Sequence, residues 1–334
     1  MRFYLAIVTL ILLANIVQAH VPLFPEGNEN ISSAMLISDP GKSWAIYSIL
    51  SPERPQYYSF YIDKGKEIQL SLLKAIDPKE KGFEPSMALI VPGIESKESL
   101  PGYVIVPKGY GAIAVKSNRS EQAVYEPFGP SSYDQLSDLD IAAPESGVYY
   151  VAAYGNRNNS NMNSSMIGHY GLAIGYREEF TFTERILTPL RLISVYQWEG
   201  QSLSTILMPM LVAILVGLFI IWRSTIRTLF YRAGTLAGFL ILGTSATVLS
   251  QMAFGLIRAP AGSEVAITVL LAIIPVVLGV VAVRLSRGEA GILQRVVMAV
   301  IGTIALLAGY GLIAGPLLAI AASVLPSRKS NLRA

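Results

Sequence analysis

The sequence predicts an extracytoplasmic all-β antiparallel sandwich of the jelly-roll type, followed by an α-helical transmembrane bundle. Three observations carry this prediction. Residues 203–222 form an uncharged apolar run that is long enough to cross the roughly 30 Å hydrocarbon core of a bilayer. The preceding half contains many short β-type runs separated by turn residues, and no long helical pattern. Ten of the 26 Lys and Arg residues but only two of the 23 acids lie from residue 200 onward, so the two parts carry formal charges of −5 and +8.

Residues 1–19 have the pattern of a secretory signal peptide: one early basic residue, an apolar run, and small residues before a cleavage point after Ala19. Cleavage there would make His20 the mature N-terminus, and the alternative is an uncleaved anchor. Under both interpretations the domain that follows lies outside the cytoplasm. Residues 20–42 are rich in Pro, Asn, Ser and Gly and are predicted to form an extended segment ahead of the sandwich.

The predicted sandwich covers residues 43–177. Its clearest strand is 66–74, where Ile68, Leu70 and Leu72 alternate with polar neighbours and therefore share one face of a sheet. Further strands are predicted at 43–50, 56–63, 85–93, 103–107, 111–117, 138–144, 147–155 and 169–177.

Four runs in this region, QYYSFYIDKGKEIQLSL, SMALIVPG, IAAPESGVYYVAAYG and HYGLAIGYR, follow one another in an order that resembles the bacterial pre-peptidase C-terminal domain family. The best anchors are Gly65, Pro92-Gly93 and Gly147-Val148-Tyr149-Tyr150. The resemblance covers residues 43–177 and implies a small jelly-roll-like sandwich appended to a secreted protein, without implying an activity. The sequence departs from the family pattern in a longer insert at 94–139 and in lacking an accompanying peptidase domain.

Residues 178–202 are predicted to form a juxtamembrane interfacial segment with a short helix bent at Pro189. Tyr196 and Trp198 are expected in the aromatic belt at the membrane surface, and Trp222 is expected in the same role at the end of the first span. The alternative for 178–202 is an exposed linker.

Four spans are predicted in the transmembrane region 203–325, at 203–222, 233–256, 265–283 and 296–325. Three arginines follow the first span and three follow the third, whereas Arg258 is alone in the intervening loop. This asymmetry places both arginine-rich loops in the cytoplasm, in agreement with an outward sandwich. The cytoplasmic-loop charges are Arg223, Arg227, Arg232, Arg284, Arg287 and Arg295.

The last apolar block, 296–325, is too long for one ordinary span and too short for two. Gly309, Gly311, Gly315 and Pro316 offer an alternative, a break into a re-entrant or tilted segment. A complete fourth span would place the tail 326–334 outside, although its basic residues favour the cytoplasm.

Two histidines, His20 and His169, are candidate copper ligands. Cleavage after Ala19 would give His20 a free amine beside its imidazole, and the imidazole of His169 would complete a T-shaped nitrogen set that suits Cu(II). The arrangement resembles the histidine brace of copper monooxygenases and of some periplasmic copper carriers. The competing interpretation is that the two histidines never meet, and then no cofactor is expected.

Four Asn-x-Ser sequons, at Asn30, Asn118, Asn158 and Asn163, are candidate glycosylation sites, although the last two lie in an Asn/Ser-rich loop that produces sequons by composition alone. The chain contains no cysteine, which excludes disulfides and a thiolate nucleophile. No Gly-x-Ser-x-Gly elbow and no Gly-rich phosphate motif occurs, so catalysis is unsupported. The arginines flank spans, which leaves no argument for nucleic-acid binding.

The leading hypothesis is a non-enzymatic, multi-pass cell-membrane protein whose outward sandwich binds a partner protein or a glycan. Expected partners are the bilayer and either other membrane or cell-surface proteins or further copies of the chain. Copper handling through His20 and His169 is the second hypothesis, and an accessory subunit of a membrane transport complex is the third. Several tyrosines are candidates either for a recognition surface or for core packing: Tyr57, Tyr58, Tyr103, Tyr110, Tyr125, Tyr133 and Tyr149.

Overall fold

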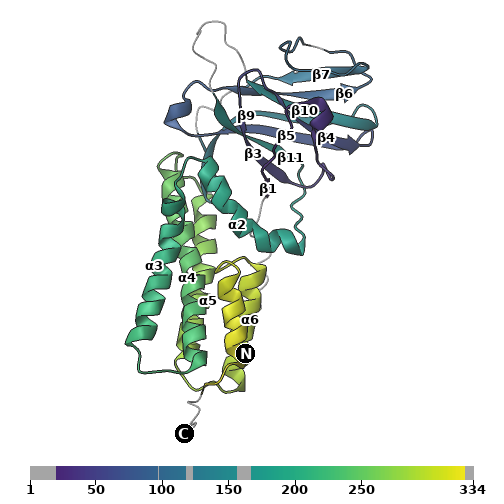
Figure 1. Ribbon diagram of the computed structural model, residues 1–334. Coiled ribbons are helices and arrows are strands. Elements are labelled where there is room, and N and C mark those ends of the chain that lie inside the picture. Colours follow the sequence, from purple (N-terminus) through teal and green to yellow (C-terminus); the bar gives the residue numbers. More distant parts are fainter. Residues whose placement is uncertain (1–19, 97, 118–122, 156–166, 328–334) are drawn as a thin grey trace.

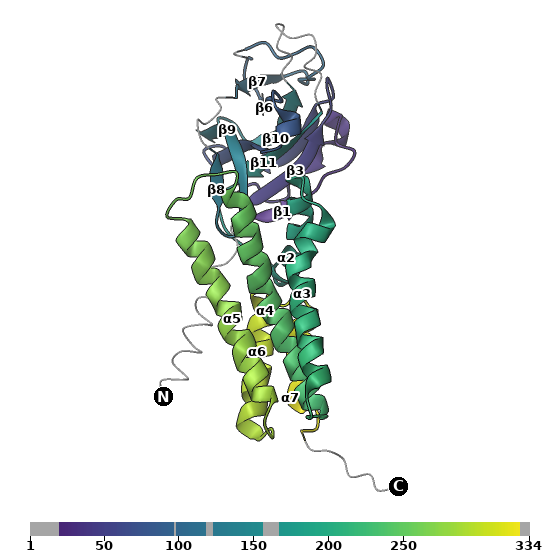
Figure 2. The same ribbon diagram turned by 90° about the vertical axis from the view of Figure 1, so that its left-hand side faces the viewer.

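The computed structural model describes residues 20–96, 98–117, 123–155 and 167–327. Two packed β-sheets form the N-terminal part, and six α-helices follow in the remainder of these ranges. Two perpendicular views show the sandwich at one end of the molecule and the helices at the other (Figures 1 and 2). The predicted fold class, a β-sandwich followed by a helical bundle, is confirmed.

The sheet nearer the helices, here called the proximal sheet, has six strands in the order β1 (Val21–Leu23), β3 (Trp44–Leu50), β11 (Gly168–Ile174), β5 (Glu67–Ala75), β9 (Ser131–Ala142) and β8 (Val124–Glu126). The other, the distal sheet, has five strands in the order β2 (Met35–Leu36), β4 (Gln56–Ile62), β10 (Gly147–Gly155), β6 (Pro85–Pro92) and β7 (Tyr110–Val115).

The sheets are mixed and not purely antiparallel, because an edge pair in each sheet, β1 with β3 and β2 with β4, is parallel. Parallel neighbours need a long crossover, and the extended segment that separates β1 from β3 provides one.

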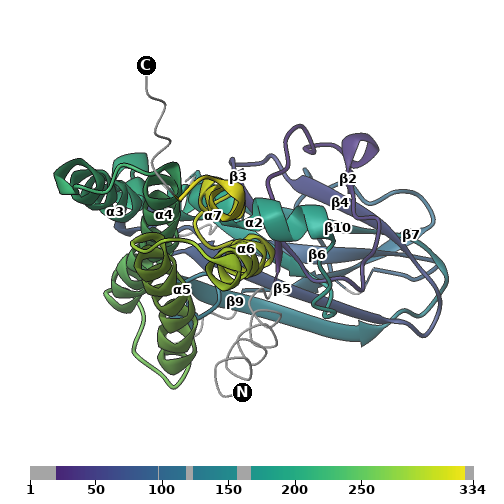
Figure 3. The ribbon, with the colours of Figure 1, turned by 90° about the horizontal axis from the view of Figure 1, so that it is seen from below.

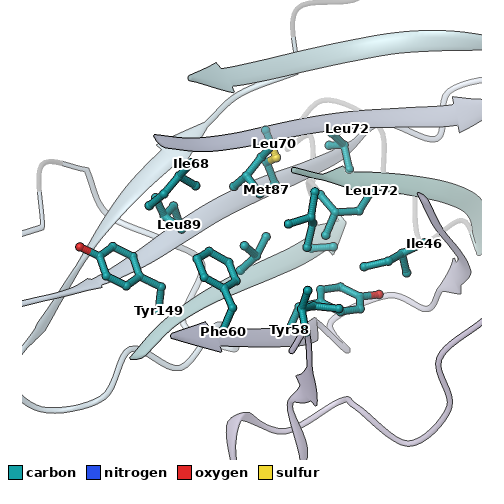
Figure 4. Close-up of a cluster of buried hydrophobic side chains, with 14 of the residues drawn as sticks. Ile46, Tyr58, Phe60, Ile68, Leu70, Leu72, Met87, Leu89, Tyr149 and Leu172 are labelled. Atoms are coloured by element: carbon teal, nitrogen blue, oxygen red, sulfur yellow. The ribbon is translucent and has the colours of Figure 1, made fainter. Parts of the chain in front are cut away.

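The core between the two sheets contains the side chains that the alternating pattern of residues 66–74 places on one face. Ile68, Leu70 and Leu72 of β5 are buried, and they pack with aromatic and aliphatic side chains of the distal sheet (Figure 4). The hydroxyls of Tyr58 and Tyr170 are 2.5 Å apart across this core, so both buried phenols have a hydrogen-bond partner.

The predicted strand 103–107 is wrong: this segment is irregular and covers the outer face of the distal sheet. Val104 is buried there, and the Ile105 amide donates to the Tyr57 hydroxyl at 2.7 Å. Pro101 and Pro107 bracket the segment and lack the N–H that a ladder position requires.

The helices are α2 (Phe182–Trp198), α3 (Leu203–Arg223), α4 (Leu229–Leu256), α5 (Val265–Ser286), α6 (Ile292–Leu307) and α7 (Ala314–Val324). Three of them, α3, α4 and α5, are long and apolar enough to cross a membrane. Helix α4 packs against α3, α5 and α7. Glycines permit the closest approaches, since a Cβ on Gly238 would lie 2.7 Å from the Gly279 carbonyl oxygen of α5.

The block 296–325 is not one continuous helix: it breaks near the glycines that the alternative named, and whether it is re-entrant in a membrane stays a prediction. Helices α6 and α7 form a hairpin whose turn uses left-handed backbone at Gly309, Gly311 and Leu312. The Gly311 amide donates to the Thr244 hydroxyl at 2.6 Å, so the tip lies near the middle of α4. Viewed along the bundle, the hairpin lies beside α4, on the side where α2 lies (Figure 3).

Both ends of the hairpin lie at the arginine-rich end of the bundle. The Phe230 amide donates to the Pro326 carbonyl at 3.3 Å, and Arg295 donates to the Ser323 carbonyl at 2.8 Å. A fourth span would have put the end of the chain on the side opposite to the one its basic residues favour. With the hairpin, the chain leaves the bundle on the side of the two arginine-rich loops, so the two arguments agree.

This topology predicts the labelling of single-cysteine variants by a membrane-impermeant thiol reagent, which the absence of native cysteines makes unambiguous. In intact cells the reagent should label Ser263→Cys in the α4–α5 loop. It should label Thr225→Cys, Gly288→Cys and Ser327→Cys only after permeabilisation. External labelling of Ser327→Cys together with Ser263→Cys would restore the four-span arrangement.

Candidate functional site at the joint between sandwich and helices

The sandwich meets the bundle at a polar and aromatic contact that we call the joint, and three parts of the chain contribute to it. These are the end of α2, the β8–β9 hairpin, and the facing ends of α4 and α5. The joint comprises Tyr125, Ser132, Trp198, Glu199, Gln201, Gln251, Arg258 and Thr268.

Trp198 anchors the end of α2 on the proximal sheet. Its indole N–H donates to the Ser48 carbonyl at 3.1 Å, and its ring meets the Tyr47 ring edge-on at 5.0 Å between centroids. Leu73 and Ala75 of β5 complete the apolar contact. An indole buried with its N–H paired gives both apolar area and orientation, so the end of α2 has a defined position on the sheet.

The predicted lipid-facing role of Tyr196 and Trp198 is corrected by this packing, because both side chains are buried inside the protein. Their position just before a span matched the aromatic belt, but both are buried, and Trp198 packs against the proximal sheet. Trp222 differs: it is 69% exposed at the end of α3, and its role as an interfacial anchor stays a prediction.

The first turn of α2 is attached separately. Thr181 and Glu184 form a capping box, and the Glu184 carboxylate also accepts two bonds from the Lys42 ammonium, at 2.6 and 2.7 Å. Burial alone would raise the pKa of Glu184, but the bonds from Lys42 and Thr181 outweigh it and lower that pKa. Further along, Arg191 donates to the Pro22 carbonyl of β1.

Glu199, which follows α2 directly, is the buried charge of the joint, with 2% of its surface exposed. Its carboxylate accepts from the Ser132 amide of β9 at 3.2 Å and from the Gln201 side chain at 3.2 Å. The same Gln201 amide donates to Gln251 of α4 at 2.7 Å. One carboxylate thus joins the sandwich, the α2–α3 linker and a long helix.

Burial raises the pKa of the Glu199 carboxyl from its ordinary 4.5 to about 7, while the bonds from Ser132 and Gln201 and the nearby Arg258 limit the rise. The Arg258 guanidinium donates to the Glu199 backbone carbonyl at 3.0 Å and lies over the Phe254 ring. Burial also raises the pKa of the neighbouring Glu126 carboxyl, which accepts from the Phe128 amide.

The β8–β9 hairpin contacts α4 and α5 directly. The Thr268 hydroxyl of α5 donates to the Pro127 carbonyl at 2.8 Å, so the Tyr125 hydroxyl, 2.9 Å away, donates to Thr268. Gly255 of α4 permits the approach, since a Cβ there would lie 3.1 Å from the Tyr125 ring.

Polar side chains within the spans are used for helix packing. Thr235 pairs with Ser286 of α5 at 2.9 Å, and Ser245 donates to the Ala272 carbonyl at 2.8 Å. Thr244 binds the hairpin tip, so the three groups all join helices to neighbouring segments of the bundle.

The structure does not bring the two histidines together. His20 contacts the Ser43 hydroxyl, whereas His169 contacts Glu80 and pairs with Ile49. Ser43 and Ile49 lie at opposite ends of β3, about 20 Å apart along a strand rising about 3.3 Å per residue. Among the described residues, no three His, Asp or Glu side chains form a group that could hold a metal ion.

The remaining predicted sites lie apart from the joint. Asn30 is exposed next to a short 3-10 helix, Ile31–Ser33, and its glycosylation stays a prediction. Asn118, Asn158 and Asn163 lie outside the described residues, as does the signal segment 1–19.

Sequence reasoning missed Glu199, although it left a signal. An acid a few residues before a 20-residue apolar run must either reach water or be buried with partners, and its neighbour Trp198 favoured burial. Its partner Ser132, and Gln251, which binds Gln201, lie far away in the sequence, so no local pattern could identify them.

The part of the distal sheet's outer face that the segment around Val104 does not cover carries exposed apolar side chains. Of the seven candidate tyrosines, Tyr57, Tyr58, Tyr125 and Tyr149 are buried, which is the core-packing alternative for these four. Leu36 is 70% exposed and Tyr61 is 58% exposed, and Val148 pairs with Tyr61 across β4 and β10.

No family model matches the chain, and no curated protein does. Among solved structures, it is similar to the pre-peptidase C-terminal domain of a collagenase from Bacillus anthracis, with 16% identity over 44% of this chain and 97% of that one, at a TM-score of 0.24.

Two copper-binding proteins are also similar at this level. They are the secreted protein MopE of Methylococcus capsulatus, with 11% identity over 38% of this chain and 71% of that one at a TM-score of 0.18, and the surface-associated CorA of Methylomicrobium album BG8, with 12% identity over 48% and 99% at 0.20. At these TM-scores, what those proteins bind has no bearing on this chain.

The raised pKa of Glu199 predicts a pH-dependent stability. The folded state retains the proton between pH 4.5 and about 7 while the unfolded chain loses it, so stability should fall as pH rises through this window. The contribution approaches about 1.4 kcal/mol per pH unit. Unfolding of the full chain in nanodiscs, measured from pH 5 to 8, should show this slope and lose it in Glu199→Gln. Parallel curves for the two proteins would contradict the assignment.

The close approach at Gly255 predicts that a larger residue opens the joint. Gly255→Val should cost about 1–3 kcal/mol by overpacking and increase hydrogen exchange in 124–135. Gly288→Val is the matched control, because a Cβ there meets nothing within 4 Å. Equal exchange in both variants would show that the contact is not tight.

Proposed function

We propose that this protein is a membrane-anchored, non-enzymatic binding protein that presents the outer face of its distal sheet to a partner protein outside the cytoplasm. The observation that carries the proposal is the joint. Because Glu199, Trp198 and Thr268 attach the sandwich to the helices, the proximal sheet is occupied and the distal sheet points away from the bundle (Figure 1).

The orientation follows from charge. Arg223, Arg227, Arg232, Arg284 and Arg287 are all exposed at the end of the bundle opposite the sandwich. Loops rich in arginine stay on the cytoplasmic side of a membrane. The sandwich, at the opposite end of the bundle, is then on the outer side.

The chemistry of the free face favours a protein partner over a glycan. Leu36, Tyr61 and Val148 expose aliphatic and aromatic surface on neighbouring strands, and Ile105 of the covering segment is exposed as well. Exposed apolar side chains that gather on one face are typical of protein interfaces, with tyrosine enriched at their centres.

Photo-crosslinking in intact cells tests the proposal. A benzophenone amino acid at Tyr61 should give one discrete adduct, and the matched position Ile49, 47% exposed on the proximal sheet, should not. Tyr61→Ser combined with Leu36→Ser should reduce the adduct formed from a probe at Val148 at least several-fold. An adduct of twice the chain mass would identify a second copy as the partner, and adducts of equal yield from Tyr61 and Ile49 would refute a specific surface.

A further inference from the structure

The hairpin leaves part of the bilayer thickness without a helix. Helix α6 has 16 residues, which at about 1.5 Å per residue amounts to about 24 Å, less than the roughly 30 Å hydrocarbon core. The 21 residues of α3 reach about 31 Å. The hairpin side of the bundle therefore needs about one more layer of apolar structure on its outer side.

Helix α2 lies at that place. A Cβ on Gly309 at the hairpin tip would clash with the ring of Pro189 in the middle of α2, so the two segments touch. In Figure 1 the first turns of α2 lie beside the hairpin tip, below the upper ends of α4 and α5. A helix is about 10 Å across, so α2 over α6 gives a combined height of about 34 Å.

The depth of this contact can be placed on the other helices. The tip binds Thr244, and its neighbour Gly243 packs against Met210 and Ala213 of α3. These α3 residues lie two to three turns inside the start of that helix at Leu203. The middle of α2 is therefore level with the outer half of a span.

From the middle of α2 toward the joint, its exposed side chains change from apolar to polar. This change is expected for a helix that passes from the hydrocarbon region into the polar interface. Leu190 is 38% exposed, with Ile186 and Leu187 partly exposed one turn earlier on the same side. Toward the joint the exposed positions are polar, Ser194 and Gln197. The charged groups of α2 that bind the sandwich, Glu184 and Arg191, are engaged with Lys42 and Pro22.

We infer that α2 and the α6–α7 hairpin together form one composite crossing, in which Leu190 and Ile186 contact the acyl chains of the outer leaflet and the hairpin fills the inner part. Helix α3, which is long and apolar enough to cross a membrane, has exposed apolar side chains at the same level, Leu211 among them. The α2 segment is thus a membrane element as well as an attachment for the sandwich.

Single spin labels on the cysteine-free chain test this inference, read as collision with oxygen against a water-soluble nickel chelate in nanodiscs. Leu190→Cys should resemble Leu211→Cys, an exposed α3 position at the level of the hairpin tip, with high oxygen and low nickel accessibility. Gln197→Cys on the same helix and Val148→Cys, 39% exposed on the sandwich, should show the reverse.

If the label at Leu190 reports the nickel accessibility of Val148→Cys, α2 lies in water and the inference is wrong. Should Leu190→Cys fail to give a monodisperse protein, Ile186→Cys on the same face replaces it with the same two readings. The outcome does not depend on the crosslinking at Tyr61, so a failure here leaves the binding proposal standing.

Discussion

The burial of Glu199 between a sheet and a helix end is the constraint on which the rest of the structure depends. Only residues 199–202 separate α2 from α3, and a buried carboxylate is tolerated only where donors surround it. The Ser132 amide and the Gln201 side chain donate to this carboxylate, and Arg258 donates to the backbone carbonyl of Glu199. These bonds hold the sandwich, the linker and the end of α4 in one arrangement. A sandwich on a free linker would leave this carboxylate in water and would have no defined outward face.

The segment 94–139 contributes both to the outer face of the distal sheet and to the joint. Its first part covers much of the distal sheet with Val104 and narrows the free face to the region around Tyr61. Its last part forms β8 and the start of β9, which carry Tyr125 and Ser132 into the joint. Without this segment, the sandwich would lack the β8–β9 hairpin that contacts the helices. The outer face of its distal sheet would also be uncovered.

The membrane half shows how polar groups and glycines act together in an apolar bundle. The Thr235 and Ser245 hydroxyls of α4 bind groups on α5. The Thr244 hydroxyl accepts from the Gly311 amide, which lies in the turn between α6 and α7. The left-handed glycines at that turn let the chain reverse at mid-depth, where an exposed irregular backbone would be costly. Helix α2 packs over this turn through Pro189.

The sequence by itself determined the partition into a sheet domain and apolar helices, the buried face of β5, and the arginine asymmetry, because periodicity and composition report directly which residues avoid water. It also contained the glycines of 309–315 and so allowed the hairpin as an alternative, without deciding for it. Only the tertiary structure decided that Trp198 is covered by protein and not by lipid, that His20 and His169 lie near opposite ends of β3, and that Glu199 meets Ser132 while Gln201 meets Gln251. The physical reason is that a local pattern shows that a side chain must be buried, whereas its partner comes from a distant segment whose position the packing of the two halves alone defines.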